Sequence, residues 1–360
     1  MKPSTGKLCR LLTAALLGSH LALHAIVAHA ATPTPPMPPA PPPAAQATMD
    51  ALSKANAAVV GVRVSVAQGA RSAETLGRNR SGSGVVIGAD GLILTIGYLL
   101  LEAQSIKIVT SDNKTLPARA VAYDLATGFG LIKPLLPMRD VAPVALGSVG
   151  DVARGEPLMA ATGSQADGDE ADVSMTQMVS RRPFSGYWEY HIESAVFTSP
   201  PIDNHSGAPL FNQRGELIGI GSLFVNDALG AGGAGKLPGN MFVPVDLLKP
   251  ILNEMQTTGS TKFSRRPWIG LTSSEQGGRV QVVRVNQDSP AQAAGLEPGD
   301  FVLAVDGEKV ASLEAFYKKL WARGEPDSEI SLTVLQGAEV KVIKLKTVDR
   351  MSTMTKPDGI

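Results

Sequence analysis

The residues able to do acid, base or nucleophilic chemistry are few in this chain. It has five histidines and one cysteine, Cys9. Only His191 and His205 lie beyond residue 30. His205 directly precedes Ser206, and a serine hydroxyl is a poor nucleophile until a base removes its proton. Neighbours in an extended segment point to opposite sides, so we expect His205, and likewise His191, to be structural.

Carboxylates near these histidines do not supply the missing base. Glu189, Glu193 and Asp203 are close in sequence, but a carboxylate takes up a proton near neutral pH only when its pKa is raised. The two histidines also lack the helical H-x-x-x-H spacing of a metal site. We expect neither a metal nor a cofactor.

The first 30 residues have the parts of a secretory signal peptide. After a basic start comes a mostly apolar stretch, Leu11–Val27, and then the small-residue cleavage signal Ala28-His29-Ala30. We therefore expect cleavage after Ala30 and a periplasmic protein. The alternative is an uncleaved membrane anchor, but the apolar stretch is interrupted by polar residues and a membrane span needs about 20 apolar residues.

Composition narrows the function further. The chain has 33 basic and 33 acidic residues, which gives no electrostatic reason to expect nucleic acid or an acidic membrane as partner. Removal of the leader removes Cys9, so the mature chain has no thiol for a disulfide, a nucleophile or a metal. The 37 glycines and 26 prolines are typical of short strands joined by tight turns.

Four segments follow the leader. Residues 31–48 are rich in proline and alanine and predict a disordered linker. Residues 49–257 have the short, alternating apolar runs of an all-β domain. A polar stretch then leads to a second domain of strands and helices, residues 265–350, and residues 351–360 are expected to be a loose tail.

Local signals place elements in the first domain. The segment Gly84–Thr95 predicts two strands joined by a turn at Asp90-Gly91. A helix is expected over Val245–Met255, kinked or restarted at Pro250. The glycine-rich stretch 230–239 is expected to be a loop. Further strands are expected at 59–66, 106–110, 118–122, 130–133, 157–161, 173–179, 190–195, 208–211 and 216–222.

The second domain contains two helix starts with a clear mechanism. Ser289 is a good N-cap with Pro290 as the first helical residue, and Gly295 ends that short helix. Ser312 caps a second helix with an apolar face. The segment Asp288–Gly307 resembles PDZ domains of bacterial HtrA-type proteases, and the resemblance extends over about 80 residues of this second domain. The apolar residues on one face of the second helix are Leu313, Phe316, Tyr317, Leu320 and Trp321.

That resemblance implies a peptide-binding site. In the family, backbone N–H groups of a short apolar motif bind the C-terminal carboxylate of a peptide, and the matching residues here are Trp268, Ile269, Gly270 and Leu271. The peptide would add as a strand, against the helix that follows Ser312. The alternative is that Trp268 and Leu271 only fill the core.

The first domain resembles the trypsin-like double β-barrel of the same HtrA (DegP/DegS-type) family. Three segments carry the resemblance, over about 190 residues. Ser83–Thr95 matches the strand pair that leads to the catalytic histidine, Asp124–Lys133 matches the segment with the catalytic aspartate, and His205–Ile220 matches the segment with the nucleophilic serine. The expected fold is therefore mostly β, a trypsin-like double barrel followed by an α+β PDZ domain.

The departures from the family decide the expected activity. Tyr98 stands at the histidine position, Gly128 at the aspartate position, and Ser206 is retained as the nucleophile. Asn204 stands where a glycine amide forms the oxyanion hole together with Ser206. A tyrosine phenol has a pKa near ~10 and is a weak proton acceptor at neutral pH, and glycine has no side chain to orient a base. We expect an inactive pseudoprotease.

Two further features bear on partners. The family trimerises through aromatic residues near the start of the protease domain, and this chain has none between residues 31 and 97, so the resemblance does not extend to those contacts and the oligomeric state stays open. The run Phe184–Tyr190 follows two arginines. We expect this run to form a hairpin of the barrel whose aromatic side chains pack in the core. The alternative is a surface patch that binds a peptide.

Together these features predict an exported protein that binds peptides, unfolded proteins or protein C-termini, acting by analogy as an envelope adaptor, chaperone or regulator. Two other classes stay open. One is an active serine endopeptidase that uses Ser206 with a non-standard base. The other is a scaffold in which only the PDZ domain matters.

Overall fold

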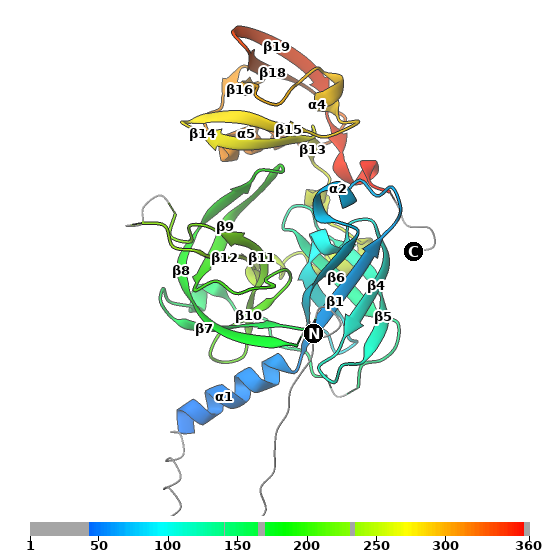
Figure 1. The fold of residues 1–360 in the computed structure, drawn as a ribbon, viewed down its shortest axis with the longest axis vertical. Coiled ribbons are helices and arrows are strands. Elements are labelled where there is room, and N and C mark those ends of the chain that lie inside the picture. Colours follow the sequence, from blue (N-terminus) through cyan, green and yellow to red (C-terminus); the bar gives the residue numbers. More distant parts are fainter. Residues whose placement is uncertain (1–42, 140, 165–169, 231–234, 356–360) are drawn as a thin grey trace, which may run out of the picture. The chain divides into compact units, whose positions relative to one another are not determined.

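The structure is a computed structural model, and it describes residues 43–139, 141–164, 170–230 and 235–355 (Figure 1). The expected signal peptide and most of the expected linker lie outside the described residues. Two closed barrels come first and an antiparallel sheet with helices follows. The predicted mostly-β architecture, a trypsin-like domain followed by a PDZ domain, is confirmed.

The first barrel closes in the order β1-β2-β3-β6-β5-β4 with antiparallel neighbours. Its core is apolar because alternate side chains of each strand point inward; every residue of β3 is buried. The strands are β1 (Val59–Val66), β2 (Asn79–Val86), β3 (Ile93–Ile96), β4 (Ala103–Val109), β5 (Thr115–Tyr123) and β6 (Phe129–Pro134).

The second barrel closes in the order β10-β11-β12-β9-β8-β7. Phe197, Phe211 and Phe242 are fully buried in it, and burying such a side chain stabilises the fold by roughly 1.5–3 kcal/mol. The strands are β7 (Pro157–Thr162), β8 (Asp172–Gly186), β9 (Tyr190–Ser199), β10 (Pro209–Phe211), β11 (Leu217–Val225) and β12 (Gly239–Pro244).

The PDZ domain has its own apolar core around a sheet in the order β14-β15-β16-β18-β19, with β17 paired to β16. Both predicted N-caps are confirmed: Ser289 accepts from Gln292 N and Ser312 from Ala315 N. The elements are β13 (Pro267–Trp268), β14 (Leu271–Gln276), β15 (Arg279–Val285), α4 (Pro290–Ala293), β16 (Phe301–Val305), β17 (Glu308–Lys309), α5 (Leu313–Trp321), β18 (Glu329–Gln336), β19 (Glu339–Lys346) and β20 (Val348–Asp349).

Both ends of the described chain are more ordered than expected. The helix α1 (Pro43–Asn56) covers residues 43–48, which were predicted to be disordered linker. Proline is tolerated in a first helical turn and alanine is the best helix former. The tail was predicted to be loose, yet η5 (Arg350–Thr353) follows β20, and the Thr355 N–H donates to the Glu102 carboxylate at 2.8 Å.

The connection between the domains is interrupted at Pro250, where the sequence predicts a kink or a restart of the helix. The stretch forms η3 (Val245–Leu247) and then α3 (Leu252–Thr258), because Pro250 has no N–H to donate to a helical hydrogen bond. The polar segment after it contains η4 (Lys262–Ser264), and both Thr261 and Ser264 are buried.

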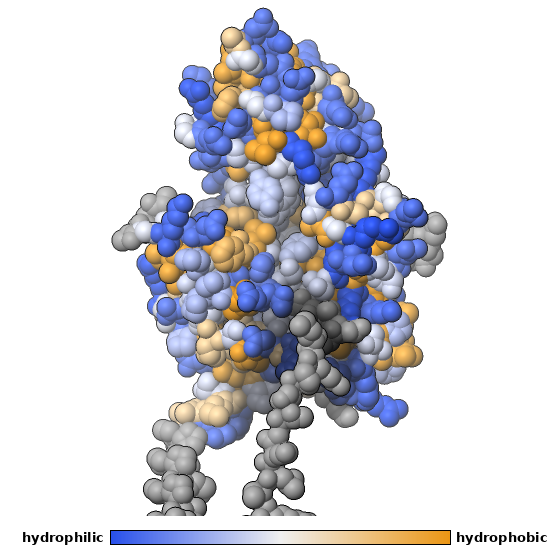
Figure 2. Space-filling model, viewed as in Figure 1, coloured by the Kyte–Doolittle hydropathy of each residue, from blue (hydrophilic) through white to orange (hydrophobic). Residues whose placement is uncertain are grey.

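The molecular surface is mixed. The face drawn in Figure 2 shows hydrophilic side chains interspersed with small hydrophobic groups, which is ordinary for globular proteins. Within the described residues, none of the helices has the length and apolar character needed to cross a membrane.

Candidate functional site

Ser206 lies in the loop between β9 and β10, and main-chain contacts fix this loop against the first barrel. The Ser83 N–H donates to Ser206 O at 2.8 Å, and the Gly207 N–H donates to Gly221 O at 2.8 Å. A Cβ on Gly207 would lie 2.1 Å from Ser83 O, and its φ is +75°, so only glycine fits there. The loop therefore holds the Ser206 hydroxyl in one place.

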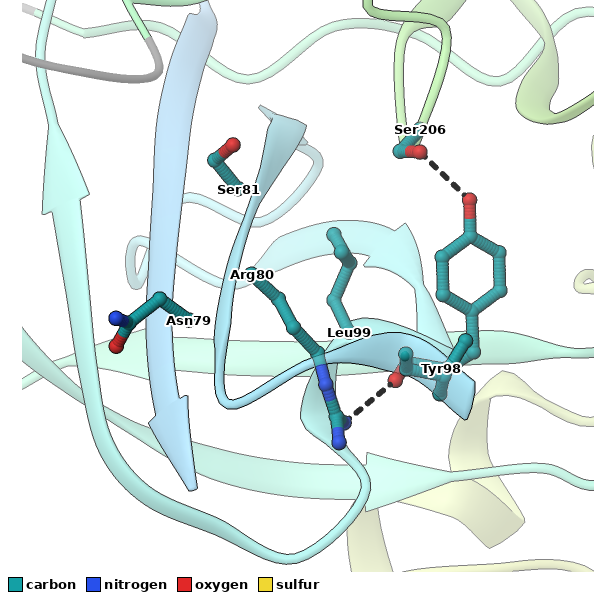
Figure 3. Close-up of a pocket in the computed structure, with 7 residues that line it drawn as sticks. Asn79, Arg80, Ser81, Tyr98, Leu99 and Ser206 are labelled. Carbon is teal, nitrogen blue, oxygen red and sulfur yellow. Dashed lines mark hydrogen bonds between the residues drawn. The ribbon is translucent and has the colours of Figure 1, made fainter. Parts of the chain in front are cut away.

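Tyr98 faces that hydroxyl directly (Figure 3). It lies in η1 (Gly97–Leu100), immediately after β3. Tyr98 Oη is 2.7 Å from Ser206 Oγ and 3.0 Å from Ser222 O. The phenol has one proton, and a carbonyl can only accept. When Tyr98 donates to Ser222 O, the contact with Ser206 is completed by the Ser206 proton.

The phenol is a poor base in this position. Burial raises the pKa of Tyr98 to about 12, and the hydrogen bond to Ser206 lowers it only in part. Tyr98 is therefore neutral at physiological pH, and a neutral phenol has little tendency to take the proton of Ser206. The hydrogen bond therefore contacts Ser206 with a group that is a weak base at neutral pH.

Gly128 lies beside Tyr98 in the main chain, since Gly97 N–H donates to Gly128 O at 2.7 Å. Its φ is +84°, and a Cβ there would lie 3.4 Å from Tyr190 Oη. Tyr190 is buried and donates to Thr127 O at 2.7 Å. The space next to Gly128 is thus filled by an aromatic side chain from β9, where the family resemblance expects a carboxylate.

The buried carboxylate of this region, Asp124, is bound elsewhere. It accepts from Thr127 N at 2.8 Å and from Thr127 Oγ1 at 2.6 Å. Thr261 and Ser264 donate to its other oxygen, both at 2.5 Å. Asp124 therefore fastens the segment after α3 to the first barrel. Sequence reasoning missed this role, because the partners lie in a segment expected to be a linker.

Neither histidine hydrogen-bonds Ser206 in the described part of the chain. Burial lowers the pKa of His205, and Asp203 opposes this only in part. His191 Nδ1 is 2.9 Å from Ser185 Oγ, and its Nε2 is 3.5 Å from Glu193. The His191 ring is thus used in contacts with Ser185 and Glu193.

His191 also belongs to a cluster of possible metal ligands with Glu193 and Glu314. A cation is already there, because Lys318 Nζ is 2.7 Å from both carboxylates. The described contacts therefore make this cluster an ion-pair network between β9 and α5.

A cleft of about 210 Å³ opens at Ser206. Arg80 forms one wall, and its guanidinium donates to Tyr98 O at 3.0 Å and to Leu101 O at 2.8 Å. It also donates to Ser72 Oγ at 2.6 Å, just before α2 (Ala73–Leu76). Arg80 thus positions the main chain of Tyr98, a role with no sequence signal. The cleft is lined by Leu76, Asn79, Arg80, Ser81, Tyr98, Leu99 and Ser206 (Figure 3).

Asn204, at the expected oxyanion-hole position, has φ +52°. This is the left-handed conformation, which asparagine adopts more readily than most residues. Asn204 therefore gives the loop a backbone angle that glycine would otherwise supply.

The predicted carboxylate-binding residues run from the end of β13 (Trp268) through Ile269 and Gly270 to the first residue of β14 (Leu271). Trp268, Ile269 and Leu271 are buried, and Gly270 has φ +88°. The N–H groups of Ile269, Gly270 and Leu271 all donate to one carboxylate, that of Glu189. These three N–H groups therefore lie close together. The alternative, that Trp268 and Leu271 only fill the core, concerns their buried side chains and leaves the backbone amides free to bind a carboxylate.

Comparison with known proteins agrees with this division of the chain. Residues 82–220 match the trypsin-like peptidase domain family, and residues 267–347 match the PDZ domain family. The probable periplasmic serine endoprotease DegP-like of Halomonas elongata is 27% identical over 287 residues, 76% of this chain and 57% of that protein. The protein of the same name from Hahella chejuensis is 28% identical, over 73% of this chain and 56% of its own length.

This chain thus spans little more than half the length of those relatives. Among solved structures, the HtrA-type protease AlgW with a tripeptide is similar, with a TM-score of 0.51 and 22% identity over 87% of this chain and 99% of that one. At this identity the likeness concerns the fold.

Proposed function

This chain has the trypsin-like peptidase domain and the PDZ domain of the HtrA-type proteases, and on that premise we propose that it is a periplasmic pseudoprotease. Its task is to bind peptides or protein C-termini through the PDZ domain. The relatives are named periplasmic, and residues 1–30 have the pattern of a cleaved leader. The adaptor, chaperone or regulator role beyond binding follows the family by analogy.

The observation that carries the proposal is the contact between Ser206 and Tyr98. A hydroxyl nucleophile needs a base within hydrogen-bond reach, and its side-chain partner among the described residues is a neutral phenol at 2.7 Å. Removing the base from a serine-protease triad costs on the order of 10⁶ in kcat. Gly128 adds no carboxylate to orient a base.

Peptide binding is supported by the PDZ sheet. The strand β14 is at the edge of the sheet, so its outward amides and carbonyls suit the addition of an extended peptide. The N–H groups of Ile269, Gly270 and Leu271 converge on a carboxylate, as the carboxylate end of a peptide would require.

The inactivity is tested with a fluorophosphonate probe and with casein as an unfolded substrate. We expect the mature chain to show no more labelling or cleavage than its Ser206→Ala variant. Labelling together with cleavage, both lost in Ser206→Ala, would instead establish the active serine endopeptidase.

Peptide binding is tested on the full mature chain with fluorescent peptides that end either in a free carboxylate or in an amide. We expect only the free-acid peptides to bind, with the same affinity in the Ser206→Ala variant. Equal binding of acid and amide peptides would contradict carboxylate recognition by the loop at Ile269–Leu271.

A further inference from the structure

The turn that joins β8 to β9, residues Gly186–Glu189, lies against both walls of the PDZ peptide groove. Tyr317 Oη, from α5, donates to Gly186 O at 2.8 Å. The Ser273 N–H, from the edge strand β14, donates to Tyr187 O at 2.8 Å. An extended peptide added to this edge would use the same β14 amide, so the turn and a peptide compete for one position.

The Glu189 carboxylate occupies the loop that the proposed function assigns to a peptide C-terminus. Its Oε1 accepts from Gly270 N at 2.8 Å and from Leu271 N at 2.9 Å, and its Oε2 accepts from Ile269 N at 3.3 Å. Glu189 is only 3% exposed. Converging backbone N–H groups form an anion site, and this one is filled by the chain itself.

The turn contacts the two parts of the site with two different groups. Tyr187 accepts from β14 with its main-chain carbonyl, and Glu189, two residues later, accepts from the loop with its side-chain carboxylate. A bound peptide would use the same two acceptors, a main-chain carbonyl beside β14 and a terminal carboxylate in the loop.

Contacts on either side hold the turn in the groove. Arg266 Nη2 donates to Glu189 O at 3.1 Å, and the guanidinium carbon of Arg266 lies 3.7 Å from the centre of the Trp321 ring. Lys318, on α5, pairs with Glu193 on β9 at 2.7 Å. Glu189 itself has φ +56°, an uncommon conformation for this residue type, so these bonds must offset a strained backbone.

We propose that Gly186–Glu189 is an internal ligand of the PDZ domain, with the Glu189 carboxylate in the place of a peptide C-terminal carboxylate. The inference rests on the proposed peptide-binding function and specifies its regulation. A free peptide binds only after the turn leaves the groove. The apparent affinity is therefore reduced by the fraction of molecules in which the turn is docked.

The test compares three full mature chains: wild type, Glu189→Ala, and the control Asp172→Asn, which changes an exposed carboxylate at the other end of the same hairpin, where its side-chain partner is Ser174. The probe is the fluorescein-labelled peptide Pro-Phe-Ser-Gly-Tyr-Trp-Val, which copies residues 183–188 and ends in a free carboxylate. Its C-terminal amide is the matched negative. Fluorescence anisotropy gives the dissociation constants, and circular dichroism checks that each variant is folded.

We expect Glu189→Ala to bind the free-acid peptide at least tenfold more tightly than wild type, and Asp172→Asn to bind it like wild type. Equal affinities for wild type and Glu189→Ala would overturn the internal ligand while leaving peptide binding intact.

The anisotropy test gives no answer if Glu189→Ala does not fold or if the peptide binds none of the chains. In those two cases hydrogen exchange on the wild-type chain decides. Slow exchange of the Ile269, Gly270 and Leu271 amides without peptide supports the docked turn, even if the proposed peptide function then fails. Exchange at the rate of an open loop would overturn the inference.

Discussion

The Ser206 cleft and the PDZ carboxylate loop differ in what each has kept. In the cleft the nucleophile position is retained, but its neighbours are the phenol of Tyr98 and the bare backbone of Gly128. In the loop the amide donors are in place and already bind a carboxylate, that of Glu189. The cleft retains the serine but has no imidazole or carboxylate beside it. The loop retains its N–H donors, but they already bind the Glu189 carboxylate.

The difference follows from which atoms do the work. Triad catalysis depends on side chains, so under the proposed function Tyr98 and Gly128 leave the site without a base and without a group to orient one. Carboxylate recognition by a loop depends on backbone N–H groups, which every residue except proline supplies. Side-chain substitution cannot easily abolish such a site, and under our proposal the chain controls it by occupying it.

The largest expected effect comes from rebuilding the cleft. We expect Tyr98→His with Gly128→Asp and Tyr190→Phe to raise fluorophosphonate labelling of Ser206 at least ~10²-fold, the lower range for a positioned general base. Tyr190→Phe is included because the phenol oxygen lies 3.4 Å from the Cβ position of Gly128, where the introduced aspartate side chain would begin. Labelling is followed by mass spectrometry.

The control for the rebuilt cleft is the same triple variant with Ser206→Ala, which must stay unlabelled. If the probe labels the wild-type chain as fast as the triple variant, Ser206 already has a working base. The proposed difference between the cleft and the PDZ loop would then be wrong.

The next effect concerns the link from the first barrel to the PDZ domain. We expect Asp124→Ala to destabilise the chain by roughly 3 kcal/mol, because it leaves the buried hydroxyls of Thr261 and Ser264 without their acceptor. That corresponds to a fall in Tm of about 6–12 °C for a domain of this size. Differential scanning calorimetry measures it.

The matched control is Asp151→Ala, since Asp151 is largely exposed and pairs loosely with Arg214 at 3.8 Å. Its effect should stay within about 0.5 kcal/mol. Similar shifts for the two variants would show that the buried Asp124 network does not hold the segment after α3.

A smaller, roughly tenfold effect is expected from pH. Burial raises the pKa of Glu189 from 4.5 to about 7, against the opposing hydrogen bonds from Leu271, Ile269 and Gly270. The docked turn thus holds a proton more tightly than the released turn. The equilibrium constant for docking of the turn is therefore largest at a pH below the ordinary glutamate pKa. It falls by up to about tenfold per pH unit as the pH rises toward 7, and it stays constant above pH 7.

Peptide affinity should therefore increase by roughly tenfold or more between pH 5.5 and 7.5, because the internal competitor weakens. The groups that face Glu189 are Arg266, Arg350 and Tyr317, while the peptide carboxylate stays ionised throughout. Anisotropy titrations measure the trend. Glu189→Gln should remove it, and an affinity that falls with rising pH would contradict the linkage.

Much of the fold was predictable from local signals. The turn at Asp90-Gly91, the caps Ser289 and Ser312, and the alternating strands each depend on neighbours in sequence. The helical residues 43–48 were not predicted, because proline-rich composition masked the helix-forming alanines.

The candidate sites were predictable only in part. The positions of Tyr98, Gly128 and Ser206 followed from the family pattern, and the structure brings Tyr98 and Ser206 into contact. The aromatic run Phe184–Tyr190 lies in the β8–β9 hairpin, as predicted, but the contact of its turn with α5 was not predicted. The contact between Glu189 and Gly270 joins distant segments, and no periodicity or composition signals such a pairing.

The smallest expected effect tests the bond at the centre of the cleft. Tyr98→Phe removes the hydroxyl that contacts both Ser206 Oγ and Ser222 O, and we expect a loss of about 1 kcal/mol, or ~2–4 °C in Tm. Ser206→Ala should cost less, because Tyr98 keeps its bond to Ser222 O. If the two hydroxyls interact, the double variant will lose less stability than the sum of the single variants. Strict additivity would mean that Tyr98 does not hold Ser206, and the hydroxyl would then be open to another base.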